Sequence, residues 1–252
     1  MTNPTKPIRI LHVLKAMNRG GIETWLMELV RRMDPTRFHF DFLTQSELRA
    51  SYDEELLQRG CGIYPCMAPD QPLRYAWNFR RIISQHGPFD VIHSHTYLFS
   101  GYVLWLARMS GIPVRIAHIY PHVDHKQGTR HRKAVRYFAS LLIGRNATHV
   151  LADSQMSMTA FQAHCRCEGL KCEVVYPCSD LTPYAKKIDR TEVRSRLGVP
   201  LDKTIVVYVA RFSSHKNHKQ IIRLAARMVH EPIHFVMAGS HGELLENVRR
   251  AS

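Results

Sequence analysis

The sequence predicts an α/β protein in which parallel β-sheets carry helices on both faces. Apolar segments of strand length alternate with amphipathic segments of helix length from Ile8 almost to the end of the 252-residue chain, as in a doubly wound parallel sheet. The glycine pair Gly20 and Gly21 follows the first apolar segment, where such folds join a strand to its helix. Both observations indicate a Rossmann-like fold.

The first predicted domain covers residues 1–180. Its clearest helix starts after the glycine pair, because apolar residues from Ile22 to Met33 recur on one stripe. Strands are expected at 8–14, 38–44, near 63, and at 90–93, 113–118, 149–152 and 173–176. Helices are expected at 52–59, 73–85, 100–109, within 126–145 and at 156–164. This number of strands makes a complete N-terminal Rossmann-like domain.

The second predicted domain covers residues 181–252. Residues 179–190 contain Pro183 and several charges and are interpreted as an interdomain connection. A new series then opens, with strands at 204–209 and 234–238, a helix at 217–229 and the start of a helix at 242–250. Roughly 50 residues bury too little surface for an independent domain. We therefore expect a partial second Rossmann-like domain, truncated at its C-terminal side.

The net charge of +14 implies an acidic partner, which is nucleic acid, an anionic membrane or a phosphorylated substrate. Cations concentrate in residues 126–145, where Val135, Phe138 and Leu142 recur at helical spacing. Two interpretations stay open for this basic helix: packing on the core with a solvated face, or contact with a membrane surface or an acceptor phosphate. Nucleic acid is disfavoured, because we do not expect the cations to have the interleaved exposed aromatics of single-strand binders, and no helix-turn-helix or finger pattern occurs.

The N-terminal segment lacks the basic start and apolar run of a secretory signal. The longest apolar stretch, residues 97–109, is too short to span a bilayer. We expect a cytoplasmic protein, with peripheral contact at the inner membrane face through 126–145 as an open alternative.

Two loops that follow predicted strands have the chemistry of phosphate binding. At Gly20 and Gly21 the absence of side chains and the following helix N-terminus let a phosphate or sugar approach the backbone. Arg211 and Lys216 lie in a second loop, directly before a predicted helix, and suit a diphosphate. The alternatives are a conformational role for the glycines and solvated loop charges for the cations.

Histidines gather after two other predicted strands, at positions 93, 95, 118, 122 and 125. His118 is best placed to hydrogen-bond a sugar hydroxyl or to offset developing charge, and the alternative is a rim histidine with a structural role. A metal site is disfavoured, because no zinc-type grouping with carboxylates is present. The cysteines lack paired metal hooks and are interpreted as reduced thiols.

Five short motifs occur in this chain: G-G-I-E from Gly20, D-V-I-H-S-H from Asp90, R-I-A-H from Arg115, A-D-S from Ala152 and A-R-F-S-S-H-K-N from Ala210. In combination they resemble the motifs of the retaining glycosyltransferases of family 4, which have the GT-B fold. The resemblance implies that Gly20 and Gly21 approach the donor phosphates and that His118 lies near the transferred sugar. It also implies that Arg211 and Lys216 bind the diphosphate.

The implied reaction moves a sugar from a UDP- or GDP-sugar to the hydroxyl of a glycan or lipid-linked acceptor with retention. It implies no cofactor and no obligatory metal. The paired-glutamate segment of the family is not matched, since Glu243 and Glu246 have the wrong spacing, and Pro177-Cys178-Ser179-Asp180 departs from its usual turn. The open alternative is a non-catalytic module that binds an acceptor or depends on a partner.

Overall fold

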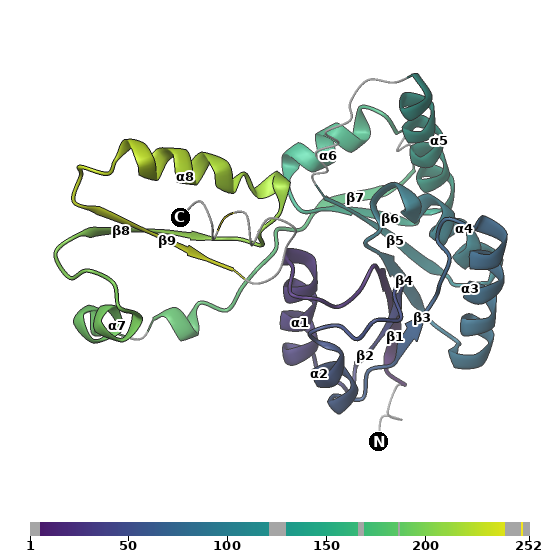
Figure 1. Cartoon of the computed structure of the whole chain (residues 1–252). Helices are drawn as coiled ribbons and strands as arrows, with labels where there is room; N and C mark the ends of the chain where they lie inside the picture. The colour runs from purple at the N-terminus through teal and green to yellow at the C-terminus, as the bar shows by residue number, and fades with distance from the viewer. Residues whose placement is uncertain (1–5, 121–129, 166–168, 186, 240–247, 249–252) are drawn as a thin grey trace. The chain divides into compact units, whose positions relative to one another are not determined.

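The computed structural model describes residues 6–120, 130–165, 169–185, 187–239 and 248. The chain divides into two compact units, Met1–Asp180 and Leu181–Ser252 (Figure 1). The expected helix start at 242–250, His122, His125 and Lys126 lie outside the described residues, apart from position 248.

Unit 1 is built on one seven-stranded sheet in which every neighbouring pair of strands is parallel, in the order β3-β2-β1-β4-β5-β6-β7. This confirms the predicted fold class. The strand bounds are β1 Ile8–Leu14, β2 Phe38–Thr44, β3 Ile63–Pro65, β4 Val91–Ser94, β5 Val114–Ile119, β6 His149–Ala152 and β7 Lys171–Val174. Of these, β7 begins two residues earlier than expected.

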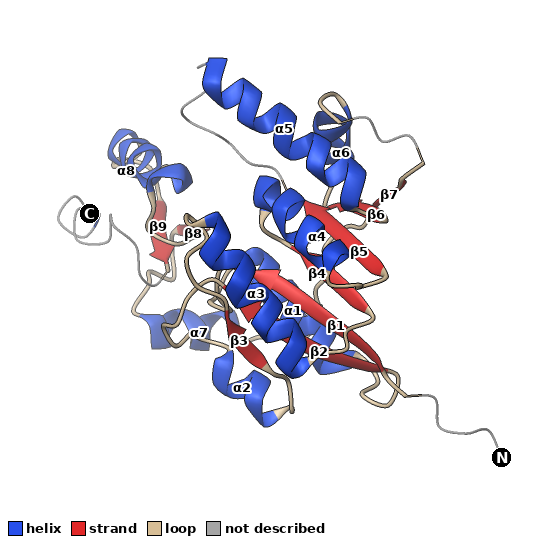
Figure 2. Ribbon diagram, turned by 90° about the vertical axis from the view of Figure 1, so that its right-hand side faces the viewer, coloured by secondary structure: helices blue, strands red, loops and turns tan. Residues whose placement is uncertain are grey.

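Six helices of unit 1 follow the strands as predicted: α1 Gly21–Arg32, α2 Asp53–Gln58, α3 Pro72–His86, α4 Ser100–Met109, α5 Arg130–Asn146 and α6 Gln155–Gln162. One apolar cluster joins the sheet to α3, α4, α5 and α6, and a second joins it to α1 and α2. Figure 2 looks onto α3 and α4, which cover the near face of the sheet. Both faces are therefore covered. The side chain of Ser154 caps α6 by accepting from the N–H of Ser157, in keeping with the preference for serine at this position of a helix.

Strand alternation divides the side chains of β1 between these two layers. Leu11 and Val13 join the cluster under α3 and α4, whereas Leu14 joins the cluster under α1. His12 therefore lies on the α1 face of the sheet. The same alternation puts Ile92 under α3 and α4, so its neighbour His93 also lies on the α1 face.

A buried carboxylate ties three segments of unit 1 together. Asp41 of β2 is 1 % exposed and receives a 2.7 Å ion pair from Arg9 of β1. It also accepts from the backbone N–H of Gly62 at 2.8 Å. A buried carboxylate needs such partners, because desolvation of an unpaired charge is costly. Asp41 thereby links β1 and β2 to the residue that precedes β3.

Unit 2 contains the parallel pair β8 Thr204–Val209 and β9 Ile233–Ala238, with α7 Arg190–Leu197 before it and α8 His218–Arg227 between the strands. The strands and α8 were predicted, but α7 was not. Its signals were present in the sequence: Asp189 caps the helix by accepting from the N–H of Thr191 at 2.8 Å, and Gly198 ends it in the left-handed region. In the part of the chain that the structure describes, no helix is long and apolar enough to cross a membrane.

Candidate functional site

The sheet of unit 1 changes direction between β1 and β4. The chain runs outward from β1 to β3, then returns to place β4 on the other side of β1. Parallel sheets bind ligands beyond the carboxyl ends of the strands at such a switch point. The loops that meet there carry Gly20 and Gly21 after β1 and His95 after β4, with His118 at the end of the adjacent β5.

The glycine pair forms the start of α1. Gly20 is the N-cap, with extended backbone and no side chain to cap the helix, and Gly21 is the first helical residue. A Cβ added to Gly21 would meet no atom within 4 Å, whereas one added to Gly20 would collide with the flexible carboxylate of Glu23. The space beside Gly21 is thus open next to a helix N-terminus, which attracts anions.

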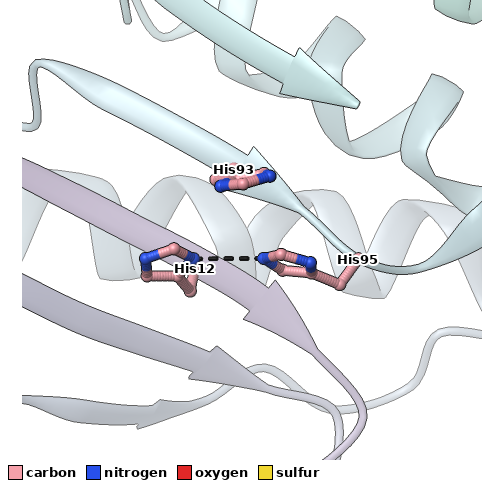
Figure 3. Close-up of side chains that lie close together, drawn as sticks. All are labelled: His12, His93 and His95. Carbon is pink, nitrogen blue, oxygen red and sulfur yellow. Dashed lines mark hydrogen bonds between the residues drawn. The ribbon is translucent and has the colours of Figure 1, made fainter. Parts of the chain in front are cut away.

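Four histidines of the α1 face form two hydrogen-bonded tiers. In the first tier, His12 Nδ1 lies 3.1 Å from His95 Nε2, and His95 Nδ1 lies 2.8 Å from the hydroxyl of Tyr120. In the second tier, His93 Nε2 lies 3.1 Å from His118 Nδ1. Figure 3 shows the facing nitrogens of His12 and His95, with the ring of His93 over them.

The two tiers contact each other through their rings. The ring centroids of His93 and His95 are 4.2 Å apart, and those of His118 and Tyr120 are 4.4 Å apart with planes within 14°. Trp25 of α1 contributes a third contact, an edge-on approach to the ring of His118 at 5.2 Å between centroids. Ring contacts and hydrogen bonds between rings therefore hold the cluster together.

Burial keeps these imidazoles neutral. His12 is 2 % exposed and His118 is 1 % exposed. Desolvation lowers the pKa of His12 to about 3, and the nearby His118 acts in the same direction. Desolvation also lowers the pKa of His118 to about 4, against the opposing charge of Asp153. The pKa values of His93 and His95 are held well below the usual range by burial and by the neighbouring histidines. A cluster of neutral rings can donate and accept hydrogen bonds without carrying charge.

The geometry can be compared with that of a metal centre. His12, His93 and His95 each offer one nitrogen, and these nitrogens lie within 4.8 Å of one another. A zinc ion needs lone pairs directed at one centre from about 2.0 Å. Here the facing nitrogens of His12 and His95 point at each other, while the ring of His93 lies against that of His95 at 4.2 Å between centroids, tilted by 35°. The rings are arranged to bond one another rather than to surround a common ion.

A second candidate site lies at the end of β8 in unit 2. Arg211 follows this strand, Lys216 ends a 3-10 turn at Ser214–Lys216, and α8 starts two residues later. Both cationic side chains are exposed. Phe212 is buried and stacks on the ring of His218 at 4.6 Å between centroids. This contact holds the loop against the first residue of α8. Two exposed cations thus precede a helix N-terminus, an arrangement that suits a phosphate group.

The predicted site residues divide between the two units. Gly20, Gly21 and His118 lie around one end of the sheet in unit 1, and Arg211 and Lys216 lie on one loop of unit 2. Their roles as substrate-binding and catalytic residues stay predictions. Sequence reasoning missed His12, Trp25 and Tyr120. A signal existed for His12, since a histidine inside the apolar strand 8–14 is unusual unless it has a partner.

Comparisons with known proteins define the class to which this fold and site belong. The structure is similar to HepE from Anabaena, solved with UDP and glucose, at a TM-score of 0.74 and 19% identity, over 97% of this chain and 65% of that one. It is also similar to a glycosyltransferase from Rickettsia africae, at a TM-score of 0.70 and 16% identity, over 97% of this chain and 64% of that one. The fold is that of the GT-B glycosyltransferases.

Sequence matches specify the family. Residues 20–178 match the model "Glycosyl transferase 4-like domain" and residues 189–251 match "Glycosyl transferases group 1". The chain therefore belongs to the family-4 type of GT-B glycosyltransferases. A relative is the putative glycosyltransferase EpsF of Bacillus subtilis, 34% identical over 260 residues, which cover 96% of this chain and 65% of EpsF. Another is the D-inositol 3-phosphate glycosyltransferase of Streptomyces avermitilis, 25% identical over 88% of this chain and 51% of that protein. The chain thus spans between half and two thirds of the length of these relatives.

Proposed function

We propose that this protein transfers a sugar from a UDP- or GDP-sugar to a hydroxyl of a glycan or lipid-linked acceptor, with retention of the anomeric configuration. The observation that supports this most directly is the open space beside Gly21 at the switch point of a family-4 sheet. The Anabaena HepE structures contain UDP, UDP with glucose, and UDP-glucose, which favours a nucleotide-sugar donor here.

In this proposal each predicted residue has one role. The N-terminus of α1 at Gly20 and Gly21 contacts the donor phosphates, and Arg211 and Lys216 neutralise the diphosphate as it leaves. These cations supply the charge stabilisation that a metal ion supplies in other transferases, so the proposed reaction needs no cofactor. His118 contacts the transferred sugar as a neutral hydrogen-bonding group. Because His118 is 1 % exposed, this contact requires neighbouring side chains to move.

Calorimetric titration of the purified chain with UDP, GDP, UDP-glucose and GDP-mannose tests the donor part of the proposal. Micromolar binding that falls at least about tenfold in Arg211→Ala and in Lys216→Ala is expected, because each charge-assisted phosphate contact contributes about 1.5–3 kcal/mol. Arg227→Ala is the matched control, since Arg227 is an exposed cation in the last turn of α8 rather than before its first turn. Equal losses in all three variants would refute a specific diphosphate site.

A transfer assay separates an enzyme from a module that binds without turnover. The chain is incubated with the donor that binds and with glycan and lipid-linked acceptors, and release of UDP or GDP is followed. Transfer that is lost in His118→Gln supports the proposal. Binding of donor and acceptor without transfer supports instead the non-catalytic, partner-dependent alternative.

We also propose peripheral contact between the basic helix α5 and an anionic membrane, with the protein in the cytoplasm. The helices α3, α4 and α5, which lie together on one side of the sheet (Figure 2), contain arginines but no aspartate or glutamate. Their outer surface exposes large apolar side chains, including Trp77 at 62 %, Phe138 at 61 % and Met109 at 66 %. Among the described side chains of α5, the buried ones are Ser140, Ile143 and Asn146, whereas Phe138 is exposed. The side chains of residues 130–136 lie outside the described part of the structure.

Exposed aromatics beside cations are typical of surfaces that bind anionic lipid interfaces. Flotation with phosphatidylglycerol vesicles is expected to carry the protein, and phosphatidylcholine vesicles are expected not to. Trp77→Ser with Phe138→Ser should weaken flotation about tenfold or more, whereas Tyr184→Ser, which removes an exposed aromatic of unit 2, should not. Flotation that is equal on both lipids would contradict the proposal.

A further inference from the structure

In the second histidine tier, the hydrogen bond from His93 can determine which nitrogen of His118 carries the proton. The rings of His93 and His118 are parallel within 2°, their centroids are 5.2 Å apart, and the facing nitrogens are 3.1 Å apart. These three values describe two parallel rings that face each other nitrogen to nitrogen, so that one nitrogen donates and the other accepts. Such a bond is strongly directional, so rotation of either ring breaks it.

Only one proton occupies the gap between His93 Nε2 and His118 Nδ1 when both rings are neutral. If His93 Nε2 carries it, His118 Nδ1 accepts and the proton of His118 is on Nε2. If His118 Nδ1 carries it, Nε2 of His118 is a bare acceptor. The neutral histidine ring intrinsically prefers its proton on Nε2, and the first arrangement satisfies this preference in both residues at once. The second arrangement forces both residues into the less stable tautomer.

The surroundings hold the pair in place. His93 contacts the ring of His95, which is itself hydrogen-bonded to His12 and Tyr120, and His118 stacks on Tyr120. His118 Nε2 is buried and has no hydrogen-bond partner among the described residues. A buried polar atom without a partner is costly in a folded protein, and a catalytic or ligand-binding role is one explanation for it.

We infer that His93 is a positioning residue that donates from Nε2 to Nδ1 of His118 and fixes His118 as the Nε2–H tautomer, a hydrogen-bond donor toward an oxygen of the substrate. The tautomer is a property of the folded chain and does not depend on transfer. Its use in sugar transfer rests on the function proposed above. His93 acts through His118 and contacts no substrate in this scheme.

The direct test is nuclear magnetic resonance of the full chain labelled with ¹⁵N-histidine, in which Nδ1 and Nε2 shifts identify each tautomer. The resonance of His118 is assigned by its disappearance in His118→Gln. Wild type is expected to show the Nε2–H pattern for His118. The Nδ1–H pattern, or a fast mixture of both, would overturn the inference without any variant of His93.

Variants of His93 test whether its N–H donation sets the tautomer of His118. His93→Phe keeps a planar ring but cannot donate, so the His118 signal should shift toward a mixture of tautomers. His93→Gln places an amide N–H near the position of Nε2 and should restore the wild-type pattern. His12→Phe is the matched control, because His12 belongs to the same buried cluster but bonds His95 instead of His118. An unchanged His118 pattern in a folded His93→Phe protein contradicts the inference.

Kinetics distinguish this inference from the proposed function. If the chain transfers sugar, His93→Phe should lower kcat about tenfold with a smaller change in KM for the donor, and His93→Gln should recover most of kcat. If the tautomer results hold but no transfer is found, the proposed function fails and the positioning role stands. If transfer is found but the tautomer does not respond to His93, the positioning role fails alone.

Discussion

Acid should destabilise unit 1 steeply, because four buried histidines must stay neutral in the folded state. The pKa of His12 is lowered to about 3 and that of His118 to about 4, from an ordinary value of 6.5. His93 and His95 are also lowered well below that value. In the unfolded chain all four titrate near 6.5, so the unfolded state binds more protons as the pH falls. Stability is therefore complete above about pH 7.5 and is lost as the pH falls through 6.5 toward the folded pKa values.

The size of the loss follows from linkage. Consider a histidine that stays neutral in the folded state and has a pKa near 6.5 in the unfolded state. Between pH 7.5 and pH 5.5, each such histidine lowers the free energy of unfolding by about 1.4 kcal/mol. Four such residues remove about 5 kcal/mol together, which is comparable to the whole stability of a typical domain. Near pH 5.5, unfolding should take up between three and four protons, or roughly 3.6.

Tryptophan fluorescence can follow the unfolding of unit 1 alone. The chain has three tryptophans, Trp25, Trp77 and Trp105, and they lie in α1, α3 and α4 of unit 1. Urea unfolding curves at a series of pH values give the free energy of unfolding, and its slope against pH gives the proton uptake.

A variant in the cluster and one outside it complete the experiment. His12→Phe should reduce the proton uptake by about one near pH 5.5, since Phe can occupy the space between Phe40 and Phe42 that stack near His12. Gln162→Ala, at an exposed position of unit 1, removes no titratable group and should leave the slope unchanged. A free energy that stays constant within about 1 kcal/mol from pH 7.5 to 5.5 would refute the neutral, buried cluster.

Three further outcomes are expected. Gly21→Ala should leave the urea midpoint unchanged or slightly raised, because the added Cβ meets no protein atom. The same variant should bind the donor about tenfold more weakly if a phosphate approaches the backbone at this position. Equal donor affinity of both proteins in calorimetry would contradict that approach. Asp41→Ala should cost about 3 kcal/mol in urea unfolding, because Arg9 loses its buried partner, and a loss under about 1 kcal/mol would show that water replaces the carboxylate. Cys178 is exposed, whereas burial raises the pKa of the Cys66 thiol to about 12; peptide mapping after brief iodoacetamide treatment should find Cys178 modified long before Cys66, and equal labelling would mean that unit 1 opens readily.

The sequence by itself determined the order of the secondary structure and the fold class. Hydrophobic periodicity and glycine placement are local signals, and they predicted β1, β2, α4, β6 and β8 with the bounds that the structure has. The weakest predictions fell where the local signal is weak. The helix α7 has no buried residue, so the apolar stripe by which a helix is recognised is absent, and its caps at Asp189 and Gly198 were the remaining signal.

The tertiary structure decided how the histidines are used. The sequence placed His93, His95 and His118 after strands, but it could not show that His12, far earlier in the chain, pairs with His93 across β1 and β4. That contact depends on the strand order of the sheet, which local patterns do not encode. Periodicity likewise gave no reason to expect Tyr120 and Trp25 against His118. Burial, ring stacking and the resulting neutral charge arise when distant segments meet, and for this reason they became visible only in the folded chain.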